Sequence, residues 1–113
     1  MARLSLAIVG LLVGAGAAGA DPIEGNWRTQ AGYTAAITDC GGSFCITLKT
    51  GPSAGRQIGS MKPTGDGNYA GKITDPANER TYAGKAALSG GSLSMSGCVL
   101  GGLICRSQTW TRL

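Results

Sequence analysis

The sequence predicts an all-β domain, a small eight-stranded antiparallel up-and-down barrel pinned by two local disulfides. After residue 20 no segment sustains a helical period; short segments instead alternate apolar and polar side chains between turns rich in glycine. Two cysteine pairs each flank one of these turns. Eight short strands with tight connections favour a meander, and closing the meander into a barrel removes both exposed sheet edges. A β-sandwich is the main alternative.

The first 20 residues predict a cleaved signal peptide that is not part of the fold. Arg3 provides a basic start, residues 4–15 form an apolar core, and residues 18–20 (Ala-Gly-Ala) are a small-residue cleavage site. The apolar run is short for a membrane span and a cleavage site follows it, which disfavours a retained anchor. We therefore expect a periplasmic or secreted protein. Its mature chain, residues 21–113, is one small domain without a membrane span.

Turn residues separate the first four strands. Gly32 follows the first strand, two glycines lie between the second and third, and a loop over residues 51–55 (Gly-Pro-Ser-Ala-Gly) precedes the fourth. Successive strand residues point to opposite faces, so with Ile37 inside, Cys40 lies on the outer face. The even-numbered apolar residues of the third strand place Cys45 on the outer face too. The predicted strands are residues 25–30, 33–40, 44–50 and 57–62.

The last four strands follow the same pattern. Residues 63–67 (Pro-Thr-Gly-Asp-Gly) and 75–79 (Asp-Pro-Ala-Asn-Glu) are strong turn signals, and residues 89–91 (Ser-Gly-Gly) turn into the seventh strand. With Trp110 pointing inward, both cysteines of this half point outward. The predicted strands are residues 68–74, 80–88, 92–98 and 104–113.

Four cysteines after an export signal predict two disulfides. The spacings C-x4-C and C-x6-C are wide for a zinc site, and the chain has no histidine. A meander puts the two cysteine-flanked turns at opposite ends of strands that are about 20 Å long, whereas bridged Cα atoms lie within about 7 Å of each other. We therefore expect the local pairs Cys40–Cys45 and Cys98–Cys105.

Composition disfavours a nucleic-acid partner and an enzyme. The mature chain has nine basic and six acidic residues, a net charge of +3, and the basic residues are scattered and form no stripe. The acidic residues fall at strand ends or turns, and no nucleophile stands beside a base. Without histidine, acid–base chemistry near neutral pH lacks its usual group. We expect no enzymatic activity, no cofactor and no metal site.

The two ends of the domain carry a tryptophan signature. Gly25 and Trp27 open the first strand, and Trp110 and Arg112 lie in the last. A glycine-x-tryptophan combined with a basic residue on the last strand resembles the closure of lipocalin-type barrels. There the tryptophan plugs one end and an arginine packs over its ring. Arg112 or Arg106 would take that part here. The alternative is that both tryptophans belong simply to the core.

Several motifs, taken in order and spacing, carry a closer resemblance. They are residues 21–27 (Asp-Pro-Ile-Glu-Gly-Asn-Trp), 40–45 (Cys-Gly-Gly-Ser-Phe-Cys), 65–71 (Gly-Asp-Gly-Asn-Tyr-Ala-Gly), 75–76 with 81–82 (Asp-Pro with Thr-Tyr), and 108–112 (Gln-Thr-Trp-Thr-Arg). Together they resemble an exported bacterial domain-of-unknown-function family (family 2147) with a small lipocalin-like (calycin-like) barrel. The resemblance implies the fold and export, but no activity or functional residues. The loop at 51–55 is shorter than the charged loop of that family, so no lid or partner contact is carried over from it.

The inner face of the last strand predicts non-enzymatic binding of a small amphiphilic or anionic ligand. If Trp110 faces inward, Arg106 and Gln108 do so as well, and buried polar groups are costly unless they are paired, hydrated or meet a ligand. The interior has small side chains at Ala35, Gly71, Gly84, Ala86 and Gly97. These positions either leave a cavity or make room for the tryptophans. The candidate ligand-binding residues are Arg106, Gln108, Tyr33, Tyr69 and Tyr82.

The alternative function is a protein–protein adaptor or inhibitor in the cell envelope that acts through its loops. Residues 99–104 (Val-Leu-Gly-Gly-Leu-Ile) are apolar for a turn. Exposed, this loop would be a contact site for an envelope protein. Folded over the barrel mouth, it would be a plug.

Overall fold

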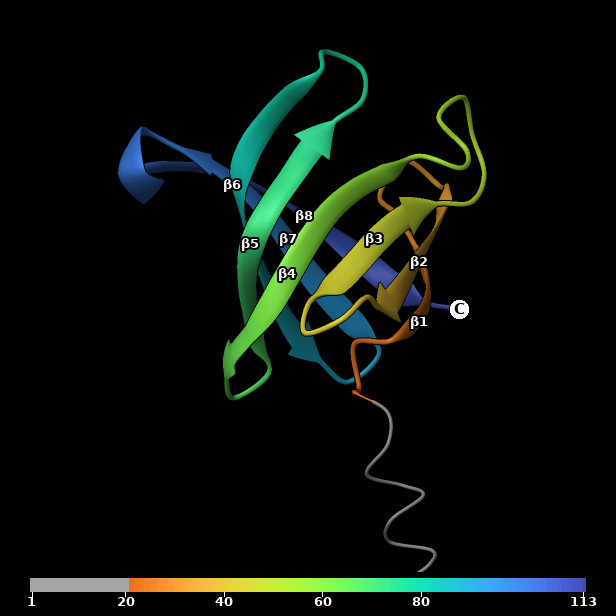
Figure 1. Cartoon of the computed structure of the whole chain (residues 1–113), viewed down its shortest axis with the longest axis horizontal. Coiled ribbons are helices and arrows are strands. Elements are labelled where there is room, and N and C mark those ends of the chain that lie inside the picture. Colours follow the sequence, from red (N-terminus) through yellow and green to blue (C-terminus); the bar gives the residue numbers. More distant parts are fainter. Residues whose placement is uncertain (1–20) are drawn as a thin grey trace, which may run out of the picture.

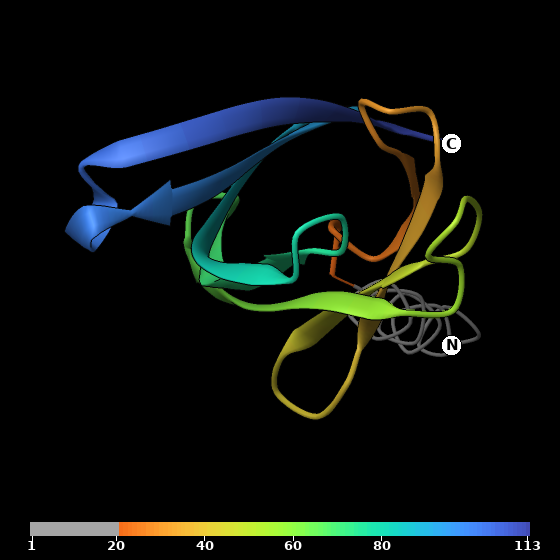
Figure 2. The same ribbon diagram turned by 90° about the horizontal axis from the view of Figure 1, so that it is seen from above.

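The computed structural model describes residues 21–113, so the predicted signal peptide lies outside the described residues. In this part of the chain eight strands form a closed barrel, in which each strand pairs antiparallel with the next and β1 pairs with β8 (Figures 1 and 2). The predicted all-β barrel is confirmed. The elements are β1 (Gly25–Arg28), β2 (Thr34–Asp39), β3 (Phe44–Leu48), β4 (Gln57–Gly65), β5 (Asn68–Asp75), β6 (Arg80–Ser89), β7 (Ser92–Val99), η1 (Leu100–Gly102) and β8 (Ile104–Arg112).

The largest difference from the predicted strand boundaries is at the end of β4. This strand continues to Gly65 and includes Pro63, which was predicted to lie in a turn. The turn itself needs only Asp66 and Gly67, whose φ angles of 54° and 78° suit a two-residue hairpin. The β4–β5 register shifts between Pro63 and Gly65, and such an irregularity tolerates a residue without an N–H group.

Alternating strand directions divide the turns between two ends of the barrel (Figure 1). The open end carries the β1–β2, β3–β4, β5–β6 and β7–β8 connections. The closed end carries the remaining three connections and the N-terminal segment, residues 21–24, that precedes β1. The site described below lies at the open end because the N-terminal segment fills the other one.

Both predicted disulfides are confirmed. Cys40–Cys45 spans the β2–β3 turn at the closed end, and Cys98–Cys105 joins directly opposed residues of β7 and β8 at the open end. Residues 21–113 contain no free cysteine. Cys98 is buried although strand alternation places its side chain on the outer face. It lies between Ala83 of β6 and Cys105 of β8, and its disulfide to Cys105 covers it further. Cys40 and Cys105 are exposed.

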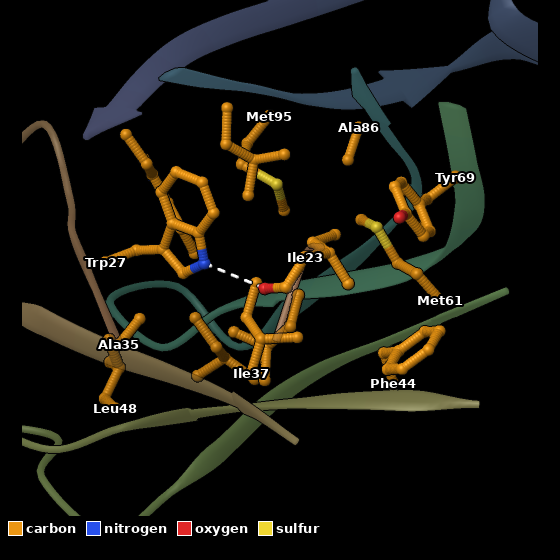
Figure 3. Packing of buried hydrophobic residues seen from close by; sticks show 14 residues of the cluster. Ile23, Trp27, Ala35, Ile37, Phe44, Leu48, Met61, Tyr69, Ala86 and Met95 are labelled. Carbon is orange, nitrogen blue, oxygen red and sulfur yellow. Dashed lines mark hydrogen bonds between the residues drawn. The ribbon is translucent and has the colours of Figure 1, made fainter. Parts of the chain in front are cut away.

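The core fills the closed half of the barrel (Figure 3). Ile23 of the N-terminal segment lies within it, and its carbonyl accepts a hydrogen bond of 2.9 Å from Trp27 Nε1. Phe44 and Tyr69 pack edge to face, with ring centroids 6.0 Å apart. An interior segment that contributes both an apolar side chain and a hydrogen-bond acceptor lets the barrel bury Trp27 without an unsatisfied N–H group.

Two of the small residues predicted to face the interior allow close packing, although Gly71 itself is exposed and only Gly84 is buried. A Cβ atom at Gly84 would lie 2.8 Å from Met61 Cε, and one at Gly71 would lie 2.0 Å from the Ser60 carbonyl oxygen. Gly71 thus permits the close approach of β5 to β4, and Gly84 accommodates the methionine that fills this part of the core.

Candidate ligand cavity

A cavity of about 1030 Å³ occupies the open half of the barrel. Its lining comes from strands β3 to β8 and from the β1–β2, β3–β4 and β5–β6 connections. The apolar part of the lining includes Leu48, Ile58, Ile73, Met95, Ile104 and Trp110. The barrel is therefore packed at one end and hollow at the other. The sequence allowed either a filled or a hollow interior, and each description applies to one half of the barrel.

The floor of the cavity is the top of the core. Leu48, Ile58, Met95 and Trp110 are buried members of the hydrophobic cluster and also line the cavity. The indole Nε1 of Trp110 donates a hydrogen bond of 2.9 Å to Gln108 Oε1, which satisfies the one polar atom of this floor. A ligand reaching the floor would meet hydrocarbon and an aromatic ring.

Strand β8 presents its polar residues to the cavity in the predicted register. Arg106, Gln108 and Trp110 alternate along one face, opposite Gly97, Met95 and Leu93 of β7. Both Arg106 and Gln108 line the cavity. Within residues 21–113 Arg106 makes no ion pair, since the salt bridge found in this part of the chain joins Arg56 and Glu79.

Two of the three predicted tyrosines lie in the same cavity. Tyr82 lines it from β6, and Gly97 leaves space for its ring, because a Cβ at Gly97 would lie 3.3 Å from Tyr82 Cβ. Tyr33 lines it from the β1–β2 connection and packs on Gly51, where a Cβ would lie 2.6 Å from the ring. Glycine at residue 51 thus makes room for the Tyr33 ring, and glycine at residue 97 makes room for the base of the Tyr82 side chain.

Tyr69 is not among the lining residues. It is buried at the closed end, and its hydroxyl donates a hydrogen bond of 2.5 Å to Asp21 Oδ1. Burial raises the pKa of the Tyr69 hydroxyl well above its usual range, and the nearby Asp21 carboxylate raises it further. Strand alternation predicts that Tyr69 points inward, but it does not predict the position of this residue along the barrel axis. Tyr69 lies nearer the closed end than the other two tyrosines.

The rim of the cavity holds an ion pair that the sequence did not predict. Arg56, after the β3–β4 loop, donates from Nη1 and Nη2 to the two carboxylate oxygens of Glu79, at 2.5 and 2.6 Å. The guanidinium lowers the pKa of the Glu79 carboxyl by hydrogen bonding. Both loops contribute lining residues, so the pair connects two neighbouring parts of the rim. No local sequence pattern links two residues in separate loops. The signal that could have predicted this ion pair is the presence of opposite charges in two loops at the same end of the barrel.

The tryptophan signature closes the opposite end. The Arg112 guanidinium lies 4.1 Å from the centroid of the Trp27 ring, so Arg112 and not Arg106 takes the stacking position. Its Nη1 donates to the Glu24 carbonyl at 2.9 Å, and its Nη2 donates to the Pro22 carbonyl. Gly25 has a φ of 130°, and a Cβ there would lie 2.8 Å from Arg112 Nη1. Glycine is required both by the backbone and by the arginine.

Residues 21–113 contain no cluster of three or more histidine, cysteine or acidic side chains that would hold a metal ion. In the same part of the chain no helix is both long enough and apolar enough to cross a bilayer. The two disulfides are compatible with an exported protein.

Part of the chain matches a known protein family. Residues 46–112 match a family described as "Uncharacterized protein conserved in bacteria (DUF2147)". The match runs from within β3 to the end of β8 and includes Tyr82, Arg106 and Gln108, whereas Tyr33 and Trp27 precede it. Searches of curated proteins and of solved structures found no match. Because the matched region is more than half of the chain, this protein belongs to the DUF2147 family of bacterial proteins, as the motifs in its sequence indicate.

Proposed function

We propose that this protein is an exported, non-enzymatic binding protein that holds a small anionic amphiphile in the cavity. The observation that carries the proposal is an apolar floor combined with an arginine that has no ion-pair partner within residues 21–113. Ligand pockets are typically concave and apolar, have volumes of about 300–1000 Å³, and contain a few polar groups that fix orientation. The cavity matches this description in size and in chemistry.

The positions of the lining residues set the orientation of the ligand. Its hydrocarbon part would contact Met95 and Trp110 at the floor, and its anionic group would lie nearer the opening beside Arg106. The Tyr82 hydroxyl, which accepts a hydrogen bond from Asn78 Nδ2 at 3.4 Å, is a donor on the same wall. An arginine favours carboxylate or phosphate because its planar fork donates two parallel hydrogen bonds.

The test uses three probes that share a twelve-carbon chain: dodecanoate, dodecanol and dodecyltrimethylammonium. The mature chain is freed of bound lipid, and the affinity of each probe is measured by calorimetry below its critical micelle concentration. We expect dodecanoate to bind most tightly. Arg106→Gln should weaken dodecanoate about tenfold or more, as loss of a charge-assisted hydrogen bond predicts, and leave dodecanol unchanged.

Arg28→Gln is the matched control, because Arg28 is exposed on β1 and is not among the lining residues. It removes the same charge from the protein and should leave all three affinities unchanged. The proposal fails if none of the probes binds, or if the two variants weaken dodecanoate equally, since the effect would then be that of net charge.

A protein–protein contact through the loops is the alternative function. It would use the exposed β7–β8 connection in place of the cavity, so Arg106→Gln would not affect it. Probe binding that depends on Arg106 therefore separates the two functions.

A further inference from the structure

The β7–β8 connection forms an exposed apolar tip. We call residues 99–104 the β7–β8 tip; it contains four aliphatic residues, two glycines and no charge. Val99, Leu100, Leu103 and Ile104 are 40%, 68%, 85% and 53% exposed. Figures 1 and 2 show the hairpin (blue) extending outward from the barrel, so the tip is not a plug of the barrel mouth. Exposed apolar patches of this kind mark interaction sites.

The fold holds the tip in this exposed position. The Cys98–Cys105 disulfide lies directly behind it, and the last register pair of the hairpin is Val99 with Ile104. Beyond this pair the chain turns through Leu100, whose φ is 54°, and two glycines. A bulky residue in the left-handed region is uncommon, and here it directs a leucine outward at the end of a cross-linked hairpin.

We propose that the β7–β8 tip docks this protein on the surface of an anionic lipid bilayer by inserting its aliphatic side chains. The size of the tip favours lipid over protein. A stable protein interface takes about 20–30 residues from each partner and is anchored by aromatic residues and arginine, whereas the tip offers six residues with neither. Insertion into the acyl boundary needs only apolar side chains and no complementary surface.

The charges beside the tip match an anionic surface. Residues 92–112, which make up the whole hairpin, contain two arginines and no acidic residue. Arg106, two residues from the tip, lies at the open end of the barrel. The neighbouring β5–β6 connection carries Asp75 and Arg80, which oppose each other in the register and offset each other, and Glu79, whose charge is offset by its ion pair with Arg56. Basic residues near an apolar insertion segment add attraction to anionic lipids.

Docking by this tip would turn the cavity toward the membrane. Val99 and Ile104 belong both to the tip and to the cavity lining, so the two apolar surfaces are continuous. An amphiphile could then pass between bilayer and cavity along hydrocarbon. This passage rests on the proposed ligand binding, but the docking does not, and it is measured on protein without ligand.

The experiment compares flotation of the mature chain with vesicles of phosphatidylcholine alone and of phosphatidylcholine mixed with phosphatidylglycerol. We expect binding that is stronger with phosphatidylglycerol. The double variant Leu100→Asn/Leu103→Asn should reduce partitioning about tenfold or more. Asparagine also tolerates the positive φ at residue 100, so the fold is preserved. The control is Leu113→Asn, which removes a leucine that is 54% exposed at the other end of β8.

A second variant measures insertion directly. In Leu103→Trp the new indole should shift to shorter emission wavelengths on vesicles and be quenched by lipids brominated in the upper acyl chain, whereas Leu113→Trp should not respond. The proposal is overturned if the parent does not bind vesicles of either composition, or if the double variant binds as the parent does. It is also overturned if the double variant only abolishes self-association in sedimentation velocity, or if vesicle binding leaves Leu103→Trp unquenched.

Discussion

Arg112 holds the seam of the barrel, and its replacement by alanine should destabilise the domain by an amount that the structure allows us to work out. The β1–β8 pairing is short, with two register pairs, Trp27 with Arg112 and Arg28 with Thr111. One further backbone hydrogen bond of 3.1 Å joins Leu113 N to the Asn26 carbonyl. The Arg112 side chain adds contacts to the N-terminal segment that backbone pairing does not provide.

The magnitude follows from three contacts. Stacking of the guanidinium over Trp27 at 4.1 Å contributes about 0.5–1 kcal/mol at an exposed site. Each of the two hydrogen bonds to the carbonyls of Pro22 and Glu24 contributes about 0.5–1 kcal/mol once solvent screening is allowed for. Arg112→Ala should therefore lower the free energy of unfolding by about 2 kcal/mol. For a domain of this length that is roughly 10 °C in Tm.

The assay is urea unfolding of oxidised protein comprising residues 21–113, followed by tryptophan fluorescence. Arg112→Lys keeps the charge but not the planar fork and should lose about half as much. Arg28→Ala is the control, since Arg28 is exposed on the same seam and makes no side-chain hydrogen bond within residues 21–113; it should change stability by less than about 0.5 kcal/mol. If Arg112→Ala and Arg28→Ala lose equal stability, the stacked arginine does not hold the seam.

Two further predictions concern the interior. The raised pKa of Tyr69 means that above about pH 10 the unfolded chain loses this proton while the folded chain keeps it, so the free energy of unfolding falls by about 1.4 kcal/mol per pH unit from this group. Tyr69→Phe should remove this component in urea titrations between about pH 10 and 11.5, and an unchanged slope would contradict the raised pKa of the buried Tyr69 hydroxyl. Gly71→Ala should cost more than about 3 kcal/mol because its Cβ would lie 2.0 Å from the Ser60 carbonyl oxygen, whereas Gly91→Ala, which meets nothing within 4 Å, should be neutral; equal effects would refute the close strand approach.

The strand order and the disulfides could be predicted because they depend on short-range patterns. Alternation set the inward face of β7 and β8, so Leu93, Met95 and Trp110 are buried where parity placed them. The cysteine pairs followed from the meander, since a local pair is within bridging distance and a pair across the barrel ends is not. The extension of β4 beyond Pro63 was missed because proline usually marks a turn, and a register shift accommodates it here.

The candidate site was predicted in part for the same reason. Arg106 and Gln108 share a parity with Trp110, and parity is a property of the sequence. Height along the barrel is a property of the register between strands, so the sequence did not distinguish Tyr82, which lines the cavity, from Tyr69, which lies in the closed half. For the same reason the sequence did not decide whether Arg112 or Arg106 packs on Trp27. The β1–β8 register places Arg112 opposite Trp27 and so decides it.

By itself, then, the sequence determined the number of strands, their inner faces and the local disulfides, because each of these depends on residues a few positions apart. Only the tertiary structure decided that half of the barrel is hollow. That outcome depends on Ile23, which lies outside any strand, entering the closed half and on its carbonyl pairing with Trp27. It also decided that Arg56 and Glu79 meet across two loops. Contacts between segments without periodic structure depend on where the closed barrel brings the chain, and no local pattern encodes that position.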